Sequence, residues 1–127
     1  MPLDLNDVDY NWEQAFSVAA NPASYTIDPK KDIEEVIASI DGENDGPQWQ
    51  AVVKLKKKPK WKGNRYAWIS SGCDYSGWVC QAAGSIMMAK TLELLFNPYL
   101  MDRQIREDFV PILKEKLGEH YWTYLMI

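Results

Sequence analysis

The segment from residue 48 to residue 89 restricts the fold most, because it holds three apolar stretches separated by short polar connections. The first stretch alternates in the manner of a half-buried strand. Its alternating apolar residues are Trp49, Ala51, Val53 and Leu55. Residues 66–70 and 79–89 predict two more strands, the last with a bulge or bend at Gly84. Strands joined by short turns pair antiparallel, so we expect a meander.

Two helices are predicted before this meander. Apolar residues at helical spacing indicate a helix over about residues 9–20, which Asn21-Pro22 ends. A second helix is predicted from the N-cap Asp28, with Pro29 at its first position, to residue 40. Its apolar stripe at spacing i, i+3, i+4, i+7 consists of Ile33, Val36, Ile37 and Ile40.

Two further helices are predicted after the meander. Thr91 or a neighbour caps a short helix that Asn97-Pro98 ends. A longer helix runs from about Asp102 towards Leu117 and stops at Gly118. Pro111 either kinks this helix or marks a second start capped by Asp108. The last seven residues, 121–127, have the composition of a strand.

These elements predict an α+β fold, in which N-terminal and C-terminal helices pack against a three- to four-stranded antiparallel sheet. A chain of 127 residues has the usual size of one domain. We expect that domain to comprise helices at 9–40, the meander at 48–89, and helices at 91–117 followed by a tail. The content of 46% apolar and 25% charged residues is that of an ordinary globular protein.

Charge and segment composition exclude several classes of protein. The net charge of -4 argues against indiscriminate binding to nucleic acid over the whole surface. No apolar run approaches the ~20 residues that a membrane helix needs, and the first residues lack the basic and apolar parts of a secretion signal. Two cysteines are too few for a disulfide scaffold. We therefore expect a cytoplasmic protein that has no membrane partner.

The segment 70–81 is the densest in polar and amphipathic side chains. Cys73 and Cys80 flank a six-residue connection, so paired strands would bring them face to face. Three interpretations remain open: two reduced core cysteines, a cross-strand disulfide or redox pair, and a metal or catalytic role. Zinc normally takes four ligands, and with only two cysteines and His120 the sequence matches no standard zinc motif.

The loop 41–46 places oxygen donors at alternate positions before a glycine, as in the first half of a calcium loop. These donors belong to Asp41, Glu43 and Asp45. The bidentate glutamate that such a loop needs at its twelfth position is replaced by Val52. The loop is therefore interpreted as a solvated turn, or as a group of carboxylates that recognises a basic partner.

Six lysines cluster around Pro59 and Trp61, in and directly before the connection between the first two strands of the meander. They are Lys54, Lys56, Lys57, Lys58, Lys60 and Lys62. An exposed Trp61 would stack on a base while the ammonium groups met phosphates. The alternative is a connection kept soluble by lysines that discourage aggregation between sheets.

Catalytic chemistry has little support in the sequence. His120 is the only histidine, and it follows a predicted helix stop, where a structural or surface histidine is more usual. Neither common type of glycine-rich phosphate loop is present. We predict no catalytic residue, no metal and no cofactor.

The segment Cys73-Asp74-Tyr75-Ser76-Gly77-Trp78-Val79-Cys80-Gln81 resembles a C-D-Y-[S/T]-G-W-x-C-Q segment of small uncharacterised phage and bacterial proteins. The resemblance covers about residues 41–96 and implies a phage or mobile-element source; it implies no established activity. Members often carry Asp where this chain has Val79, which weakens any metal or acid-base role for the turn.

The function predicted from these features is a non-enzymatic protein-interaction domain with an unidentified protein partner. The predicted binding surface is the hairpin end formed by 41–47 and 73–81, with Tyr75 and Trp78 as exposed anchors. Its residues are Asp41, Glu43, Asp45, Asp74, Tyr75, Trp78 and Gln81. The alternatives are a ligand-binding protein or enzyme that uses Cys73, Asp74 and Cys80, and nucleic-acid binding through 54–62. A homodimer that pairs through the apolar tail 121–127 is a further expectation.

Overall fold

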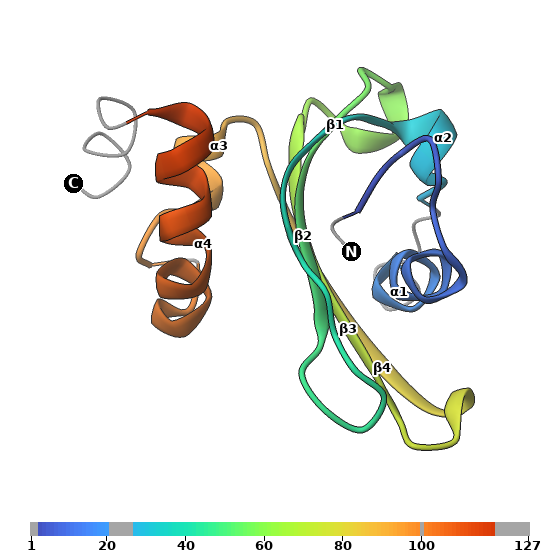
Figure 1. Ribbon diagram of the computed structural model, residues 1–127. Helices are drawn as coiled ribbons and strands as arrows, with labels where there is room; N and C mark the ends of the chain where they lie inside the picture. Colours follow the sequence, from blue (N-terminus) through green and yellow to red (C-terminus); the bar gives the residue numbers. More distant parts are fainter. Residues whose placement is uncertain (1–2, 21–26, 100, 119–127) are drawn as a thin grey trace.

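The computed structural model describes residues 3–20, 27–99 and 101–118, and its centre is a four-stranded antiparallel sheet (Figure 1). The strands follow one another in the order β1-β2-β3-β4, as in a meander. Their bounds are β1 Ile33–Ile40, β2 Trp49–Leu55, β3 Tyr66–Asp74 and β4 Gly77–Ala89. The predicted α+β class and the antiparallel sheet are confirmed.

Along the chain, helices come before β1, between β2 and β3, and after β4. They are α1 Tyr10–Ala20, α2 Pro29–Asp32, the 3-10 helix η2 Pro59–Trp61, α3 Leu92–Leu95 and α4 Arg103–Leu117. The predicted helix starts are confirmed, since the side chain of Asp28 accepts from the Lys30 amide at 2.9 Å and that of Thr91 from the Leu94 amide at 3.1 Å. Pro111 lies inside α4, which is a single helix, so no second helix starts at Asp108.

The predicted helix over 28–40 is wrong beyond Asp32, because residues 33–40 form β1. The apolar stripe came from a strand that is buried on both faces and whose pairing with β2 shifts register twice. The first two stripe residues, Ile33 and Val36, pack on the α1 side of the sheet. The other two, Ile37 and Ile40, pack on the opposite side. Register shifts and two-sided burial together mimic helical spacing.

Helices cover both faces of the sheet, with α1 on one side and α3 and α4 on the other (Figure 1). The core on the α1 side is rich in aromatic residues, including Trp12, Phe16, Trp49, Trp61 and Trp78. The core on the other side includes Val52, Trp68, Leu95, Phe109 and Leu113. β2 is therefore buried on both faces along much of its length, whereas the sequence predicted a half-buried strand.

α1 approaches the sheet closely at Gly84 of β4. A Cβ atom added there would lie 2.4 Å from the Ser71 hydroxyl and 2.9 Å from the backbone of Ala19. The Ser71 hydroxyl in turn donates to the Ala15 carbonyl at 2.7 Å. The predicted bulge at Gly84 is absent, because the β3–β4 register is continuous until it shifts between Cys73 and Asp74. Glycine is needed here for close packing.

No helix in the part of the chain that the structure describes is long and apolar enough to cross a membrane. The predicted strand-like tail, 121–127, and His120 lie outside the described residues.

We expect Gly84→Ala to lower the free energy of unfolding by about 1–3 kcal/mol, because the new methyl group meets helix backbone that cannot turn aside. Gly72→Ala is the matched control on β3, where the nearest atom, at 3.0 Å, belongs to the side chain of exposed Gln48. We expect the control to change stability by less than about 0.5 kcal/mol. Urea unfolding measures both, and equal effects would contradict the proposed close packing.

Candidate functional site

The two segments that the sequence assigned to a binding surface lie at the same end of the sheet (Figure 1). The Asp45 amide donates to the Cys73 carbonyl at 2.9 Å, and the Cys73 thiol donates to the Asn44 side chain at 3.4 Å. The loop between β1 and β2 is thus attached to the end of β3. We call this end, with Asp41, Glu43, Asp45 and Asp74, the acidic end.

The acidic end exposes its carboxylates and one large aromatic ring. Asp41, Glu43 and Asp45 are exposed, whereas Asp74 is half-buried and accepts from the amide and the hydroxyl of Ser76 at 2.9 and 2.6 Å. This bonding holds the β3–β4 turn and leaves the Tyr75 side chain 82% exposed. Backbone placement puts Gln81 in β4, and its side chain lies outside the described atoms.

A hollow of about 500 Å³ opens beside the acidic loop. Asp45 and Asp74 line it together with small residues of β3 and β4, Gly72 and Ala83 among them. Two carboxylate residues at the wall of a hollow suit a positively charged side chain.

The expectation that Trp78 projects into solvent is wrong, because its side chain is only 8% exposed. Its ring packs against Trp49 with centroids 5.1 Å apart, and its indole nitrogen donates to the Asn11 side chain at 3.0 Å. Trp12 likewise donates to Asp41 at 3.1 Å. The indole nitrogens of these two tryptophans therefore form hydrogen bonds within the protein.

The strand that carries Trp78 exposes the next residue instead. Successive strand residues point to opposite faces, so once Trp78 packs towards α1 its neighbour Val79 must point the other way. Val79 is 87% exposed. The sequence indicates that Trp78 and Val79, as neighbours in a strand, lie on opposite faces of the sheet. It does not tell which of the two faces a helix covers.

The structure does not place the two cysteines opposite each other. Cys73 pairs with Ala82 in the β3–β4 register, and it is a buried free cysteine. Burial, then the negative charge of Asp74, raise the pKa of the Cys73 thiol, which disfavours the reactive thiolate. The predicted cross-strand disulfide is thus not formed by Cys73, and the side chain of Cys80 lies outside the described atoms.

Among residues 3–20, 27–99 and 101–118 no three His, Cys, Asp or Glu side chains are grouped to hold a metal ion.

A buried carboxylate organises the opposite end of the sheet. Asp32, only 2% exposed, accepts from Lys58 at 2.6 Å, from the Asp28 amide at 2.8 Å and from Lys60 at 3.2 Å. Burial raises the pKa of Asp32, but the hydrogen bonds from Lys58 and Asp28 and the charge of Lys60 outweigh it. The pKa of this carboxyl therefore lies below its ordinary value.

The predicted base-stacking role of Trp61 is wrong, because the Trp61 side chain is 1% exposed. The ammonium group of Lys60 lies over the Trp61 ring, 4.5 Å from its centre. Lys58 and Lys60 form ion pairs with the buried Asp32, so two of the six lysines have a structural role.

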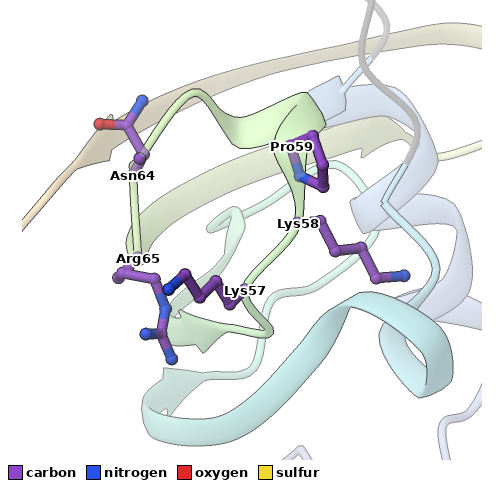
Figure 2. A pocket seen from close by; sticks show the side chains of 6 residues that line it. Lys57, Lys58, Pro59, Asn64 and Arg65 are labelled. Carbon is purple, nitrogen blue, oxygen red and sulfur yellow. The ribbon is translucent and has the colours of Figure 1, made fainter.

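A pocket of about 520 Å³ lies in the same connection (Figure 2). Lys57 and Arg65 both line it, and the Lys58 side chain points away from them in Figure 2. Arg65 donates to the Leu55 carbonyl at 3.1 Å and approaches Glu34 at 3.6 Å. Because Lys58 and Arg65 are each compensated by a carboxylate, the pocket is a weaker anion site than its residue types suggest.

Charge is strongly separated along the sheet. Ten of the fourteen Lys and Arg residues lie at positions 30, 31, 54–65 and 90, which we call the basic end, and none lies in 36–53 or 66–89. The segments of the basic end contact one another: the Lys56 ammonium donates to the Lys30 carbonyl at 3.2 Å. The strands thus run between an acidic and a basic end.

In comparisons with known proteins, no family model, no curated protein and no solved structure matches this chain. The resemblance of residues 73–81 to a phage and bacterial segment stays a prediction.

We expect Trp78→Ala to lower the free energy of unfolding by about 3–5 kcal/mol, the usual loss for a buried tryptophan. Tyr75→Ala, three residues away in the exposed turn, should change it by less than about 0.5 kcal/mol. Thermal and urea unfolding of both variants test this, and a Trp78→Ala protein as stable as the wild type would show that the ring is not core.

Asp32 should make stability fall in acid. Since its folded pKa lies below the unfolded value of about 3.9, the stabilisation is present above that value and is lost as the pH falls through the folded pKa. Asp32→Asn should cost about 1–3 kcal/mol at neutral pH and flatten the acid dependence. Glu35→Gln, at an exposed position of β1, is the control. Urea midpoints between pH 2 and pH 7 that are parallel in the wild type and Asp32→Asn would contradict this role.

Proposed function

We propose that this chain is a non-enzymatic protein-interaction domain that binds a basic segment of a partner protein through its acidic end. The observation that supports this most is Tyr75, which is 82% exposed in a turn that Asp74 holds in place. An exposed aromatic ring on a constrained turn loses little conformational freedom when it is buried by a partner, so it is an effective anchor.

Electrostatics support the choice of a basic partner. The acidic end carries four carboxylate residues, and the strands and loops that build it, 36–53 and 66–89, contain no lysine or arginine. Such an arrangement attracts a cationic segment and accelerates its association. The hollow beside Asp45 and Asp74 accommodates one cationic side chain.

The proposal includes a cytoplasmic location and a phage or mobile-element source. A buried free thiol at Cys73 is what a reducing compartment preserves. The source follows only from the resemblance of residues 73–81 and is part of the same proposal.

The test selects binders from a displayed library of random peptides and measures their affinity by fluorescence anisotropy. We expect lysine- and arginine-rich peptides to be enriched, and Tyr75→Ala to weaken their binding about thirtyfold or more, the loss typical of a central aromatic contact. The double variant Glu43→Gln/Asp45→Asn should weaken binding about three- to tenfold and reduce its dependence on salt.

Tyr99→Ala is the matched control, because Tyr99 is 95% exposed and lies between α3 and α4, outside the acidic end. Enriched peptides without basic residues, or equal losses for the two tyrosine variants, would overturn the proposal.

A further inference from the structure

β4 is an edge strand without the usual protection. Within the described residues β1 and β4 form the two edges of the sheet, and β4 is the longest strand, with thirteen residues. Its sequence, GWVCQAAGSIMMA, contains no charged residue and no proline. Natural proteins normally place such residues on an edge to prevent pairing with another chain.

The other edge shows what protection looks like in this fold. β1 carries Glu34 and Glu35, and its register shifts twice. Other parts of the chain also bond to β1. The Lys116 ammonium of α4 donates to the Val36 carbonyl, and the Leu3 backbone amide donates to the Ser39 hydroxyl. Between Ala82 and Ala89, β4 has neither a charged residue nor a register shift, so this part of its edge differs from β1.

The hydrogen bonds of β3 determine which backbone groups of β4 face outwards. Directly before β3, the Arg65 carbonyl accepts from the Leu55 amide, and the Arg65 amide donates to the Ala89 carbonyl of β4. Within β3, the Cys73 carbonyl accepts from the Asp45 amide. The carbonyl groups of odd-numbered β3 residues thus face the β2 side, and Ala89 of β4 faces β3. Even-numbered β3 residues then bond to β4, where their register partners are odd-numbered. The backbone groups left at the open edge belong to Ala82, Gly84, Ile86 and Met88.

We propose that β4 pairs antiparallel with β4 of a second copy of this chain, which joins the two sheets into one of eight strands. A two-fold axis through Ala83 places the two Ala83 residues opposite each other, next to the part of β4, Ala82–Ala89, that pairs with β3 in continuous register. It also brings the end of β4 that carries Val79 to the end of the other β4 that carries Met87. Val79, now 87% exposed, gains an apolar neighbour across the interface.

Charge complementarity favours a second copy over an unrelated strand. β4 runs from the acidic end at Asp74 to the basic end at Lys90 and Arg65. Antiparallel pairing of β4 with itself therefore brings the acidic end of each copy to the basic end of the other. The uncharged strand sets no like charges opposite each other.

The test measures the mass of the intact chain by light scattering and sedimentation up to about 100 µM, where even micromolar dimers form. We expect twice the 14.7 kDa of one chain. Ala83→Lys and Ser85→Lys, both at exposed positions, should each raise the dimer dissociation constant about tenfold or more. Tyr99→Lys is the control for an added surface charge and should leave that constant unchanged.

Two further measurements locate the interface. Mixing Ala83→Lys with Ala83→Glu should restore a dimer, now of mixed composition, because opposite charges then face each other across the axis. Hydrogen exchange should show the amides of Ala82, Gly84, Ile86 and Met88 becoming protected as the protein concentration rises.

A chain that stays monomeric over this range, or that binds its own residues 119–127 or an added peptide at β4 in place of a second copy, overturns the proposal. A dimer that Ala83→Lys and Ser85→Lys leave unchanged also overturns it, because its interface then lies elsewhere. These outcomes are separate from those for Tyr75, which concern peptide binding at the acidic end.

Discussion

The packing of α1 on the β3–β4 side of the sheet is the contact on which the other features depend. It requires a glycine at position 84, since any side chain there meets the backbone of Ala19, and it is held by the bond from Ser71 to Ala15. With α1 so close, the large rings next to it become core, Trp78 among them. On this face of the sheet Trp12, Trp49, Trp61 and Trp78 are buried, whereas Tyr75 at the acidic end is exposed.

Asp32 has a comparable part at the other end of the sheet. A carboxylate buried where α2 meets β1 needs cations, and Lys58 and Lys60 supply them from the connection between β2 and β3. Two lysines of a connection that resembles a nucleic-acid site in the sequence are thereby engaged in stabilising the fold. The charge that remains still separates the molecule into a basic end and an acidic end, a polarity that suits both a basic partner and antiparallel self-pairing.

Local chemistry explains why parts of the fold were predictable. The helix starts at Asp28, Thr91 and Asp102 follow from side chains that bond amides within three residues of themselves. The antiparallel meander follows from short connections that leave no room for a crossover. β1 was not predictable in this way, because a stripe made by two register shifts and two buried faces has the spacing of a helix.

By itself the sequence determined the α+β class, the order of the strands after residue 48 and most helix ends, because all of these depend on neighbours along the chain. Only the tertiary structure decided that Trp78 and Trp61 are core, that Val79 is exposed, that Cys73 faces Ala82, and that β4 forms an edge of the sheet in the described part of the chain. The reason is physical: burial and pairing are set by the element that lies across the sheet, and that element comes from a distant part of the chain.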